Sequence, residues 1–499
     1  MAPLGRRIEG DRVKRYGHWI DGRGRAPEAG VYITSTSLWT GSTLAEIPSG
    51  NSADVAAAVI SASSAFAAWR ALKPGVRGRL LADIAAGIRA EQQLLADLEG
   101  AEAGKPAAQS LREVDAAASY FDFYAGLANI PSGEVIDLGP GMHGYTIHEP
   151  YGVIGVITPW NAPLNQAARA VVPALLAGNV AVVKPSEFTS ASMVELAQLF
   201  MEAGFPAGVV NVVTGLGPEV GEALVTHRHV AHIGFTGGSA AGRKIYELAA
   251  RNFKTVTLEL GGKSPNIVFE DADLDQAVKG VVSGIFAATG QSCQAGSRLL
   301  LQRSIHDKFV AKLVEFMRDV KLGDPTAPET QIGPVATRPQ FNKVLEYIQI
   351  AKDEGATCVL GGKSRPDLGA GQFVEPTIFT GVRNDMRIAQ EEVFGPVLAV
   401  IPFEDEAEAV AIGNDVAYGL AAAVWTQNLR RAMAMVEKLQ AGTVWVNNYR
   451  ATSFTSPFGG YKESGIGRES GTETIKEYLN TKCVWISTDL DVPNPFVRR

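Results

Sequence analysis

The sequence predicts an α/β protein built from two large domains, and three observations support this prediction. The chain has 499 residues, which is more than one hydrophobic core usually serves. Short apolar stretches alternate with helical ones between residues 180 and 250. A second alternating region follows between residues 264 and 446. Such alternation is typical of a doubly wound parallel sheet with helices on both faces.

The elements are expected in the following order. Between about residues 54 and 128, Ala- and Leu-rich stretches carry apolar residues at helical spacing and are interrupted at Pro74 and Gly75. The run YTIHEPYGVIGVITPWN then predicts β-structure that ends in a turn. The first alternating region predicts strands at 180–183, 209–213 and 231–235 and helices at 191–202, 219–224 and 240–250. The second region predicts strands at 266–269, 358–361 and 397–403 and helices at 305–319 and 340–354.

The tail segment TKCVWIST, residues 481–488, predicts a strand that has no local partner. A strand of this kind pairs with a distant segment, in the same chain or in another subunit. We expect YTIHEP, residues 145–150, to be its companion.

Composition excludes several classes of protein. Apolar residues make up 46% and charged residues 20% of the chain, which is ordinary for a globular protein. The formal net charge of −7 offers no broad basic surface, so nucleic acid is not an expected partner. The three cysteines are too few and too scattered for a disulfide framework or a metal cage. The charged N-terminus lacks the apolar stretch of a secretory signal, and no apolar run approaches the roughly 20 residues of a membrane span. We therefore expect a cytoplasmic chain with no metal and no membrane partner.

Two glycine-rich segments follow predicted strands and open predicted helices. The first carries Gly215, Gly217 and Gly221, with one residue too many between the last two glycines for the dinucleotide fingerprint. The second, FTGGSAAGRK, places Gly238 and Ser239 where backbone N–H groups could bind a pyrophosphate. Tight turns that need glycine explain either segment alone. Two such loops in consecutive strand–helix units favour a nucleotide site.

The segment VVKPSE adds a polar strand end. A carboxylate such as Glu187 can accept hydrogen bonds from both hydroxyls of an adenosine ribose and would repel a 2′-phosphate, which favours NAD over NADP. Lys184 either binds the ribose hydroxyls or is a solvated surface lysine.

Two further segments carry candidate reactive groups. TLELGGKSP places Glu259 at the end of an alternating strand, where it is either a base or an edge carboxylate beside a glycine turn. GQSCQAGSR places Cys293 between small residues, which is an open setting for a nucleophile. A lone cysteine is more often buried and inert. Cys358 and Cys483 lie in apolar strands and are interpreted as structural.

TPWN, KPSE, FTGGSAAG, LELGGKSP, GQSCQAGSR, EEVFGPV and PFGGYKESGIGRE occur in this order over nearly the whole chain. The sequence resembles the aldehyde dehydrogenase superfamily, and within it the hydrolytic, NAD-linked branch. The resemblance implies a Rossmann-like NAD-binding domain formed by residues 1–127 and 151–261 and a catalytic domain formed by residues 262–461. It also implies a small β element for oligomerisation, residues 128–150 and 477–499, and a homodimer or homotetramer.

The resemblance also implies roles for individual residues. Cys293 would be the nucleophile, Glu259 the general base and Asn161 the donor to the oxyanion. Glu469 would be a second acid on a proton path to Glu259, although it could instead simply pair with Arg468 or another nearby base. The implied cofactor contacts are Thr158, Trp160, Lys184, Glu187, Gly217, Gly238, Ser239, Glu392 and Phe394.

The chain departs from the family pattern at three places. Ala170 stands where several relatives have a lysine on the presumed proton path, so that relay is in doubt. Ala162 replaces a bulky aromatic residue, which predicts a wider channel near the thiol. Ser292 and Gln294 make the surroundings of Cys293 more polar.

The expected substrate channel contains Gln166, Arg169, Arg450 and Phe458. Two arginines favour an acidic or strongly polar aldehyde, since a guanidinium binds a carboxylate through two hydrogen bonds. In the alternative, Arg169 pairs with a carboxylate of the protein and never meets substrate. An aromatic aldehyde of the hydroxylated benzaldehyde type, with Phe458 as a wall, is the second candidate. A semialdehyde dehydrogenase that transfers the acyl group to coenzyme A is disfavoured by the presence of Glu259, and a catalytically silent structural protein by the presence of Cys293, Glu259 and Asn161 together.

Overall fold

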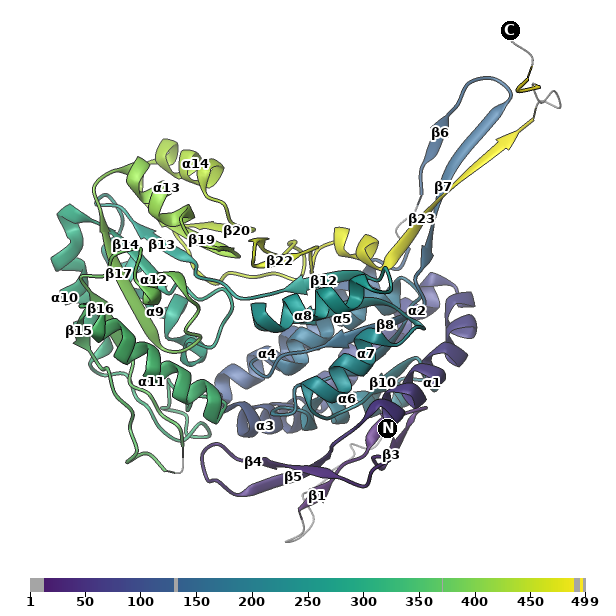
Figure 1. The fold of residues 1–499 in the computed structure, drawn as a ribbon, viewed down its shortest axis with the longest axis horizontal. Coiled ribbons are helices and arrows are strands. Elements are labelled where there is room, and N and C mark those ends of the chain that lie inside the picture. Colours follow the sequence, from purple (N-terminus) through teal and green to yellow (C-terminus); the bar gives the residue numbers. More distant parts are fainter. Residues whose placement is uncertain (1–12, 130–132, 370, 489–493, 497–499) are drawn as a thin grey trace.

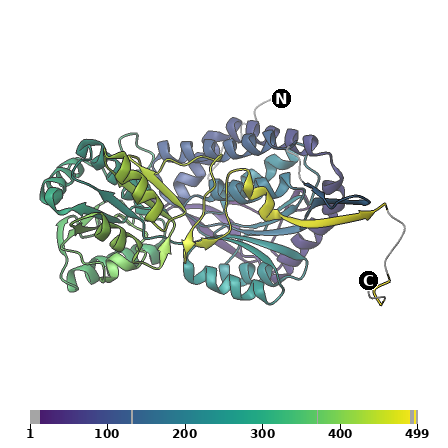
Figure 2. The same cartoon turned by 90° about the horizontal axis from the view of Figure 1, so that it is seen from above.

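The computed structural model describes residues 13–129, 133–369, 371–488 and 494–496. Parts of the expected NAD-binding segment (1–12) and of the expected oligomerisation segments (130–132, 489–493 and 497–499) lie outside the described residues. Two large sheets with their helices lie side by side, and a narrow β arm projects from one of them (Figures 1 and 2). This arrangement confirms the predicted α/β class.

The first large sheet has the strand order β22-β12-β11-β8-β9-β10-β2-β3. Its five central strands run parallel, and short antiparallel strands close both edges. The central strands are β8 (Val153–Ile157), β9 (Val180–Lys184), β10 (Val210–Val212), β11 (Val230–Thr236) and β12 (Thr255–Glu259). The edge strands are β2 (His18–Ile20), β3 (Arg23–Arg25) and β22 (Gly465–Ile466).

Two groups of helices contact this sheet. The first contains α5 (Pro163–Leu176) and α6 (Ala191–Glu202), which are backed by α2 (Pro74–Ala90), α3 (Gln92–Ala103) and α4 (Ala107–Gly126). The second contains α1 (Ser52–Ala71), α7 (Glu222–Thr226) and α8 (Ser239–Ala250). The expected interruption at Pro74 is the start of α2, where a proline at the first helical position loses no hydrogen bond.

The second large sheet has the order β15-β16-β17-β14-β13-β19-β20 and is parallel except at β15. Its strands are β15 (Thr357–Leu360), β16 (Thr377–Thr380), β17 (Val397–Phe403), β14 (Arg298–Gln302), β13 (Pro265–Val268), β19 (Ala421–Trp425) and β20 (Thr443–Val446). The helices of this part are α9 (Leu274–Ile285), α10 (His306–Met317), α11 (Arg338–Asp353), α12 (Arg387–Gln390), α13 (Glu406–Asn414) and α14 (Leu429–Lys438).

The arm consists of β23 (Leu479–Ser487), β7 (Met142–Pro150) and β6 (Val135–Asp137). Strand β23 pairs antiparallel with β7, and Thr481 lies opposite His148. The predicted pairing of TKCVWIST with YTIHEP is therefore confirmed, within one chain. The arm points away from the two large sheets (Figure 1).

Several short elements were not expected from the sequence. Strands β1 (Lys14–Arg15), β5 (Thr43–Pro48) and β4 (Tyr32–Thr36) form a small sheet, and β18 (Tyr418–Gly419) pairs with β21 (Tyr461–Lys462). The helix predicted at 219–224 begins instead as a π-helical turn, Gly217–Gly221, which continues into α7. Three 3₁₀ turns complete the described elements, at Ala287–Gly290, Arg303–Ile305 and Glu473–Tyr478.

Among the described residues, helix α1 is long and apolar enough to cross a membrane by length and composition alone. Core helices of soluble proteins pass the same test, so one such helix is weak evidence. Its buried residues include Val55, Val59 and Trp69, and the helix contacts β8, β9 and β10. Packing against the sheet therefore accounts for its apolar face.

Candidate active site

Two cavities meet at Cys293. The larger has a volume of about 1050 Å³ and the smaller about 170 Å³. Asn161, Gln166 and Cys293 line both of them. A single sulfur atom is thus placed where two different molecules can reach it from different sides.

The segment before Cys293 has an unusual backbone. Ala288 and Thr289 have positive φ angles of 54° and 56°, and Gly290 follows with a φ of 70°. A Cβ atom on Gly290 would lie 2.1 Å from the carbonyl oxygen of Gly395, so only glycine fits here. Gly262 is restricted in the same way, since its Cβ would lie 2.4 Å from the carbonyl oxygen of Cys293. Close backbone packing therefore fixes the position of the thiol.

Asn161 lies two residues before the start of α5, whose first residues are Pro163 and Leu164. Its Nδ2 donates a hydrogen bond to the backbone carbonyl of Gln291, 3.0 Å away. This bond orients the amide while the side chain still lines both cavities beside Cys293. The position suits a donor to a developing oxyanion.

Glu259 ends β12 and lines the smaller cavity together with Cys293. The side chain is buried, and within the described part of the chain neither carboxylate oxygen has a hydrogen-bond partner. Burial raises the pKa of Glu259 well above its ordinary value, and the charge of Glu469 raises it further. A carboxyl group in this state has the raised pKa that suits a general base working near neutral pH.

Glu469 is bound by Arg169, not by Arg468. The Nη2 of Arg169 lies 2.9 Å from Oε2 of Glu469, and both side chains are buried. Arg169 also donates from Nη1 to Oε1 of Gln166 (3.2 Å) and stacks over the ring of Phe458 at 4.6 Å. The alternative in which Arg169 pairs with a carboxylate of the protein is therefore what the structure shows, although Arg169 also lines the large cavity.

Arg468 has a different environment, because its Nη1 donates to the carbonyls of Gly460 and Gly467. Ala170 is buried, and a Cβ atom on Gly234 would lie 3.6 Å from its side chain. No titratable side chain stands at position 170, so the nearest cation to Glu469 is Arg169.

The thiol of Cys293 is protonated in this environment. Burial raises the pKa of Cys293 to about 12, while the positive charges of Arg169 and Arg450 act to lower it. Since the thiolate is the reactive species, ionisation of Cys293 requires a base or a change of surroundings.

The smaller cavity contains several of the residues expected to bind a cofactor. Trp160, Gly238, Glu392 and Phe394 line it. The rings of Trp160 and Phe394 meet edge to face at 5.4 Å, and Glu392 accepts a hydrogen bond from the backbone N–H of Gly262 at 3.1 Å. Phe394 has a positive φ of 58°, which is rare for a bulky residue and often marks a functional site.

The remaining predicted cofactor residues lie outside the lining of this cavity, namely Thr158, Lys184, Glu187, Gly217 and Ser239. The Nζ of Lys184 forms an ion pair with Oε2 of Glu187 at 3.0 Å. Thr158 is buried, and within the described chain its hydroxyl has no hydrogen-bond partner. Ser239 is the first residue of α8.

Two residues of the smaller cavity lie outside every motif that the sequence offered, Gln340 and Lys343 of α11. The Nε2 of Gln340 donates to the carbonyls of Val393 (2.7 Å) and Phe394 (3.0 Å) and so holds the segment that carries Phe394. Only the tertiary packing of α11 against this segment reveals that role.

All four residues predicted for the substrate channel line the larger cavity, namely Gln166, Arg169, Arg450 and Phe458. Ala162, Ser292 and Gln294 also line it. Three aromatic side chains that were not predicted join them, Tyr120, Trp445 and Phe454. Tyr120 is placed by a hydrogen bond of 2.8 Å with Ser470, the neighbour of Glu469.

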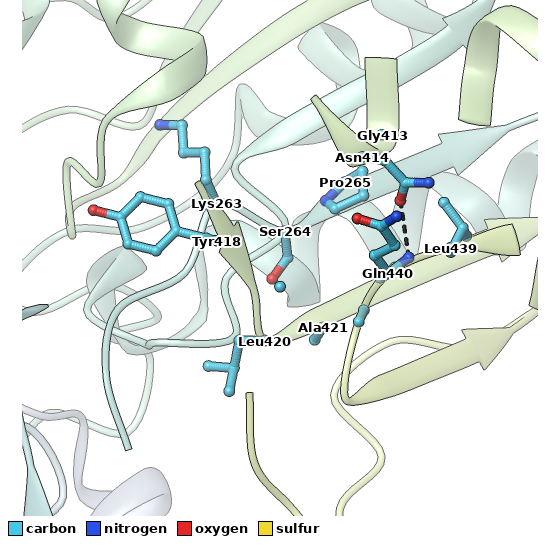
Figure 3. A pocket seen from close by; sticks show the side chains of 13 residues that line it. Lys263, Ser264, Pro265, Gly413, Asn414, Tyr418, Leu420, Ala421, Leu439 and Gln440 are labelled. Carbon is cyan, nitrogen blue, oxygen red and sulfur yellow. Dashed lines mark hydrogen bonds between the residues drawn. The ribbon is translucent and has the colours of Figure 1, made fainter. Parts of the chain in front are cut away.

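Other hollows and cysteines do not form a comparable site. The hollow drawn in Figure 3, between Tyr418 and Gln440, has a volume of only about 10 Å³, which is room for about one water molecule. Cys358 is half-buried in β15, and Cys483 is exposed on β23. Among the residues that the structure describes, no group of three or more His, Cys, Asp or Glu side chains could hold a metal ion.

Fold and site together define an α/β enzyme whose candidate nucleophile is a cysteine. The comparisons with known proteins make this class specific. A family model described as the aldehyde dehydrogenase family matches residues 26–484. The chain belongs to the aldehyde dehydrogenase family, which confirms the resemblance found in the sequence.

Three similar proteins illustrate the match. An aldehyde dehydrogenase of Emericella nidulans is 46% identical over 435 residues, which cover 86% of this chain and 87% of that protein. Betaine aldehyde dehydrogenase of Staphylococcus aureus, solved in complex with NAD+, is 39% identical with a TM-score of 0.95 and covers 97% of each chain. An indole-3-acetaldehyde dehydrogenase solved in complex with NAD+ is 41% identical with a TM-score of 0.94, and the match covers 95% of this chain and 97% of that one.

Proposed function

We propose that this protein oxidises an acidic or polar aldehyde to the carboxylic acid, with NAD as the hydride acceptor and Cys293 as the nucleophile. The observation that carries the proposal is the position of Cys293, where the two cavities meet, beside Glu259 and Asn161. Membership of the aldehyde dehydrogenase family supports the reaction type.

Residues of the smaller cavity, together with predicted cofactor residues that lie outside its lining, fit a dinucleotide. The unpartnered hydroxyl of buried Thr158 is a free hydrogen-bonding group, and a Cβ atom on Gly217 or Gly238 would meet no atom within 4 Å. Gly238 immediately precedes α8, so the first N–H groups of that helix can face a pyrophosphate. Glu187 at the end of β9 favours NAD over NADP. Two of the similar solved structures contain NAD+.

The protein groups act in a definite order. The Cys293 thiol first loses its proton, which leaves as the proton that the overall oxidation releases. The sulfur then attacks the aldehyde carbon, and the amide of Asn161 stabilises the negative charge that develops on the aldehyde oxygen. NAD, when bound, supplies the acceptor for the hydride that leaves this carbon. A thioester on Cys293 remains. Glu259 then takes a proton from water, the water oxygen attacks the thioester carbonyl, and the carboxylic acid leaves as the Cys293 sulfur regains its proton.

Replacement of the sulfur tests the proposal directly. In Cys293→Ser, we expect NADH formation with every aldehyde to fall to background while NAD still binds, because the hydroxyl is a far weaker nucleophile than the thiolate. Cys358→Ser is the matched control and should turn over at the wild-type rate, since Cys358 lies in β15 and lines neither cavity. Undiminished NADH formation by Cys293→Ser would refute the mechanism.

The acceptor of the acyl group is tested separately. If Glu259 activates water, NADH should form without coenzyme A, and Glu259→Gln should release a first burst of NADH and then stall at the thioester. A requirement for coenzyme A in the wild-type protein would instead identify an acylating dehydrogenase.

An aromatic aldehyde is the second candidate substrate, and the lining of the larger cavity favours it. Tyr120, Trp445, Phe454 and Phe458 place four aromatic rings along that cavity, and one similar structure is named for indole-3-acetaldehyde. Steady-state comparison of benzaldehyde, succinic semialdehyde and hexanal distinguishes the two candidates by their kcat/KM values.

A further inference from the structure

Some charged side chains that line the larger cavity have a partner of opposite charge, and others do not. Its lining contains the arginines Arg112, Arg169 and Arg450 and the carboxylates Glu113 and Asp115. Both carboxylates have basic partners that do not line the cavity. Lys105 donates to Glu113, and the Nε of Arg89 lies 3.3 Å from Oδ1 of Asp115. The negative charges of Glu113 and Asp115 are therefore already neutralised by basic residues that lie outside the cavity lining.

The Lys105 ammonium is shared with a second carboxylate, Glu99, at 2.5 Å. Both groups are buried, and burial raises the pKa of Glu99 to about 7. Glu113 accepts a further hydrogen bond from Nε2 of Gln109 at 2.9 Å. Lys105 and Gln109 thus hold Glu113 in place, so Glu113 does not pair exclusively with the arginines of the cavity.

The arginines of the cavity also differ in whether a carboxylate neutralises them. Arg169 is neutralised by Glu469. Arg450 has only backbone acceptors, because its Nη1 donates to the carbonyls of Ala287 (3.2 Å) and Ser283 (3.4 Å). Among the described residues, neither Arg450 nor Arg112 forms an ion pair. Carbonyl oxygens orient the Arg450 guanidinium, and the carboxylate whose charge acts on it most, Glu113, is ion-paired to Lys105.

Arg450 is also held close to the reacting centre. Its backbone has a positive φ of 63°, and the hydroxyl of the preceding Tyr449 donates to the carbonyl of Gln294 at 2.9 Å. Gln294 is the residue after Cys293, so the loop of Arg450 is tied to the segment of the nucleophile. A molecule bound at Cys293 and extending along the cavity therefore passes a fixed cation.

We propose that Arg450, assisted by the more exposed Arg112, binds a carboxylate at the far end of the aldehyde, and that the substrate is the semialdehyde of a dicarboxylic acid. This inference rests on the proposed function and narrows its substrate class. A guanidinium with free donors matches a carboxylate in charge and in planar geometry. An aldehyde with a quaternary ammonium group, such as betaine aldehyde, would bring a second positive charge to the same wall and be repelled.

The test compares aldehydes of matched length and different charge. Wild-type protein is assayed with succinic and glutaric semialdehydes, with butanal and pentanal, and with betaine aldehyde, at saturating NAD. We expect the semialdehydes to have the highest kcat/KM. In Arg450→Gln, the ratio of kcat/KM for a semialdehyde to that for the alkyl aldehyde should fall about 10- to 100-fold, mainly through KM, since one charge-assisted interaction is lost.

Three variants complete the design. Arg112→Gln should lower the same ratio by a smaller factor, and Arg450→Glu should shift the preference toward betaine aldehyde. Arg430→Gln is the control, because Arg430 is exposed on α14 and does not line the cavity; its ratio should equal that of the wild type. NAD affinity, measured by fluorescence titration, shows that each variant is folded.

Two results would overturn the inference. One is a wild-type preference for the alkyl aldehydes or for betaine aldehyde over both semialdehydes. The other is an unchanged ratio in Arg450→Gln. Either result leaves NADH formation at Cys293 intact, so failure here differs from failure of the proposed function, in which no aldehyde yields NADH or Cys293→Ser retains activity.

Discussion

The buried pair of Arg169 and Glu469 acts on the general base from two sides. The charge of Glu469 raises the pKa of Glu259, and the charge of Arg169 lowers it. An unpaired buried charge is costly, so each member needs the other. Position 170 is alanine, so no cation at that position adds to the charges of this pair, and the pKa of Glu259 depends on both partners.

The first prediction at the residue scale concerns the pH profile of kcat, which includes the hydrolysis step assigned to Glu259. Loss of activity at low pH reports protonation of Glu259, so the acid limb should lie above the ordinary range of a glutamate, about 4.3. In Glu469→Gln, a negative charge is removed, the pKa of Glu259 falls and the acid limb should move to lower pH. In Arg169→Gln, a positive charge is removed and the limb should move to higher pH. Shifts in the same direction for both variants would contradict this coupling.

The second prediction concerns the thiol. Burial raises the pKa of Cys293 to about 12, and only the thiolate reacts with iodoacetamide. Without NAD, the rate of inactivation should therefore rise steadily with pH and show no plateau up to about pH 9. Cys293→Ser is the control and should not incorporate the label at this site. A plateau near neutral pH would show that the thiol is already ionised in the free enzyme.

Helix α11 supports the segment that carries Phe394 through one side chain. Its residue Gln340 holds the carbonyls of Val393 and Phe394, and Phe394 has a strained backbone that needs such support. In Gln340→Ala, the loop should loosen, KM for NAD should rise several-fold, and stability should fall by about 1–3 kcal/mol for two lost hydrogen bonds. Gln349 lies on the same helix and bonds only to Asp353 on the surface. Gln349→Ala should therefore change neither KM for NAD nor Tm, and equal effects in both variants would refute the role of Gln340.

Periodic elements were predictable from the sequence, and irregular ones were not. The strand at 397–403 and the helix at 191–202 occur with the predicted bounds because long apolar runs define them. Strands of two residues, such as β1 and β22, carry no period that a sequence can display. The helix expected at 219–224 begins instead as a π-helical turn at Gly217, a form that no period in the sequence displays.

The residues of the candidate site also divide into those that the local sequence indicates and those that only the fold brings together. Cys293 and Glu259 could be singled out from the glycines near them, whereas Asn161 followed only from the family resemblance of the TPWN motif. The partnership of Arg169 with Glu469 joins positions that are far apart in the chain, and only the topology brings them together: Glu469 pairs with Phe458, whose ring lies under Arg169. The roles of Gln340 and Tyr120 likewise depend on which helix packs against which loop.

At the scale of the whole molecule, the site depends on both large sheets. Glu259 comes from the end of β12 in the first sheet, whereas Cys293 precedes β14 in the second. Strand β22 returns from the C-terminal part of the chain to pair with β12, and Gly465 lies opposite Glu259. The chain that leaves the second sheet after β20 therefore reaches the edge of the first sheet opposite Glu259. Motion between the sheets would change the distance from Glu259 to the thiol.

The projecting arm carries the last prediction. Val135, Trp485 and Ile486 on its strands are 92%, 63% and 45% exposed, and β6 and β23 are the free edges of its three-stranded sheet. Apolar side chains and open strand edges favour pairing with another chain, and we expect a second copy of this protein to cover them in a homodimer or homotetramer. Trp485→Glu combined with Ile486→Glu should then lower the molar mass measured by light scattering to that of a smaller assembly or a monomer. Leu429→Glu, at an exposed apolar residue on α14 far from the arm in Figure 1, should leave the assembly unchanged. A wild-type protein that is monomeric at micromolar concentration, or an arm variant with the wild-type mass, would exclude the arm as the contact between subunits.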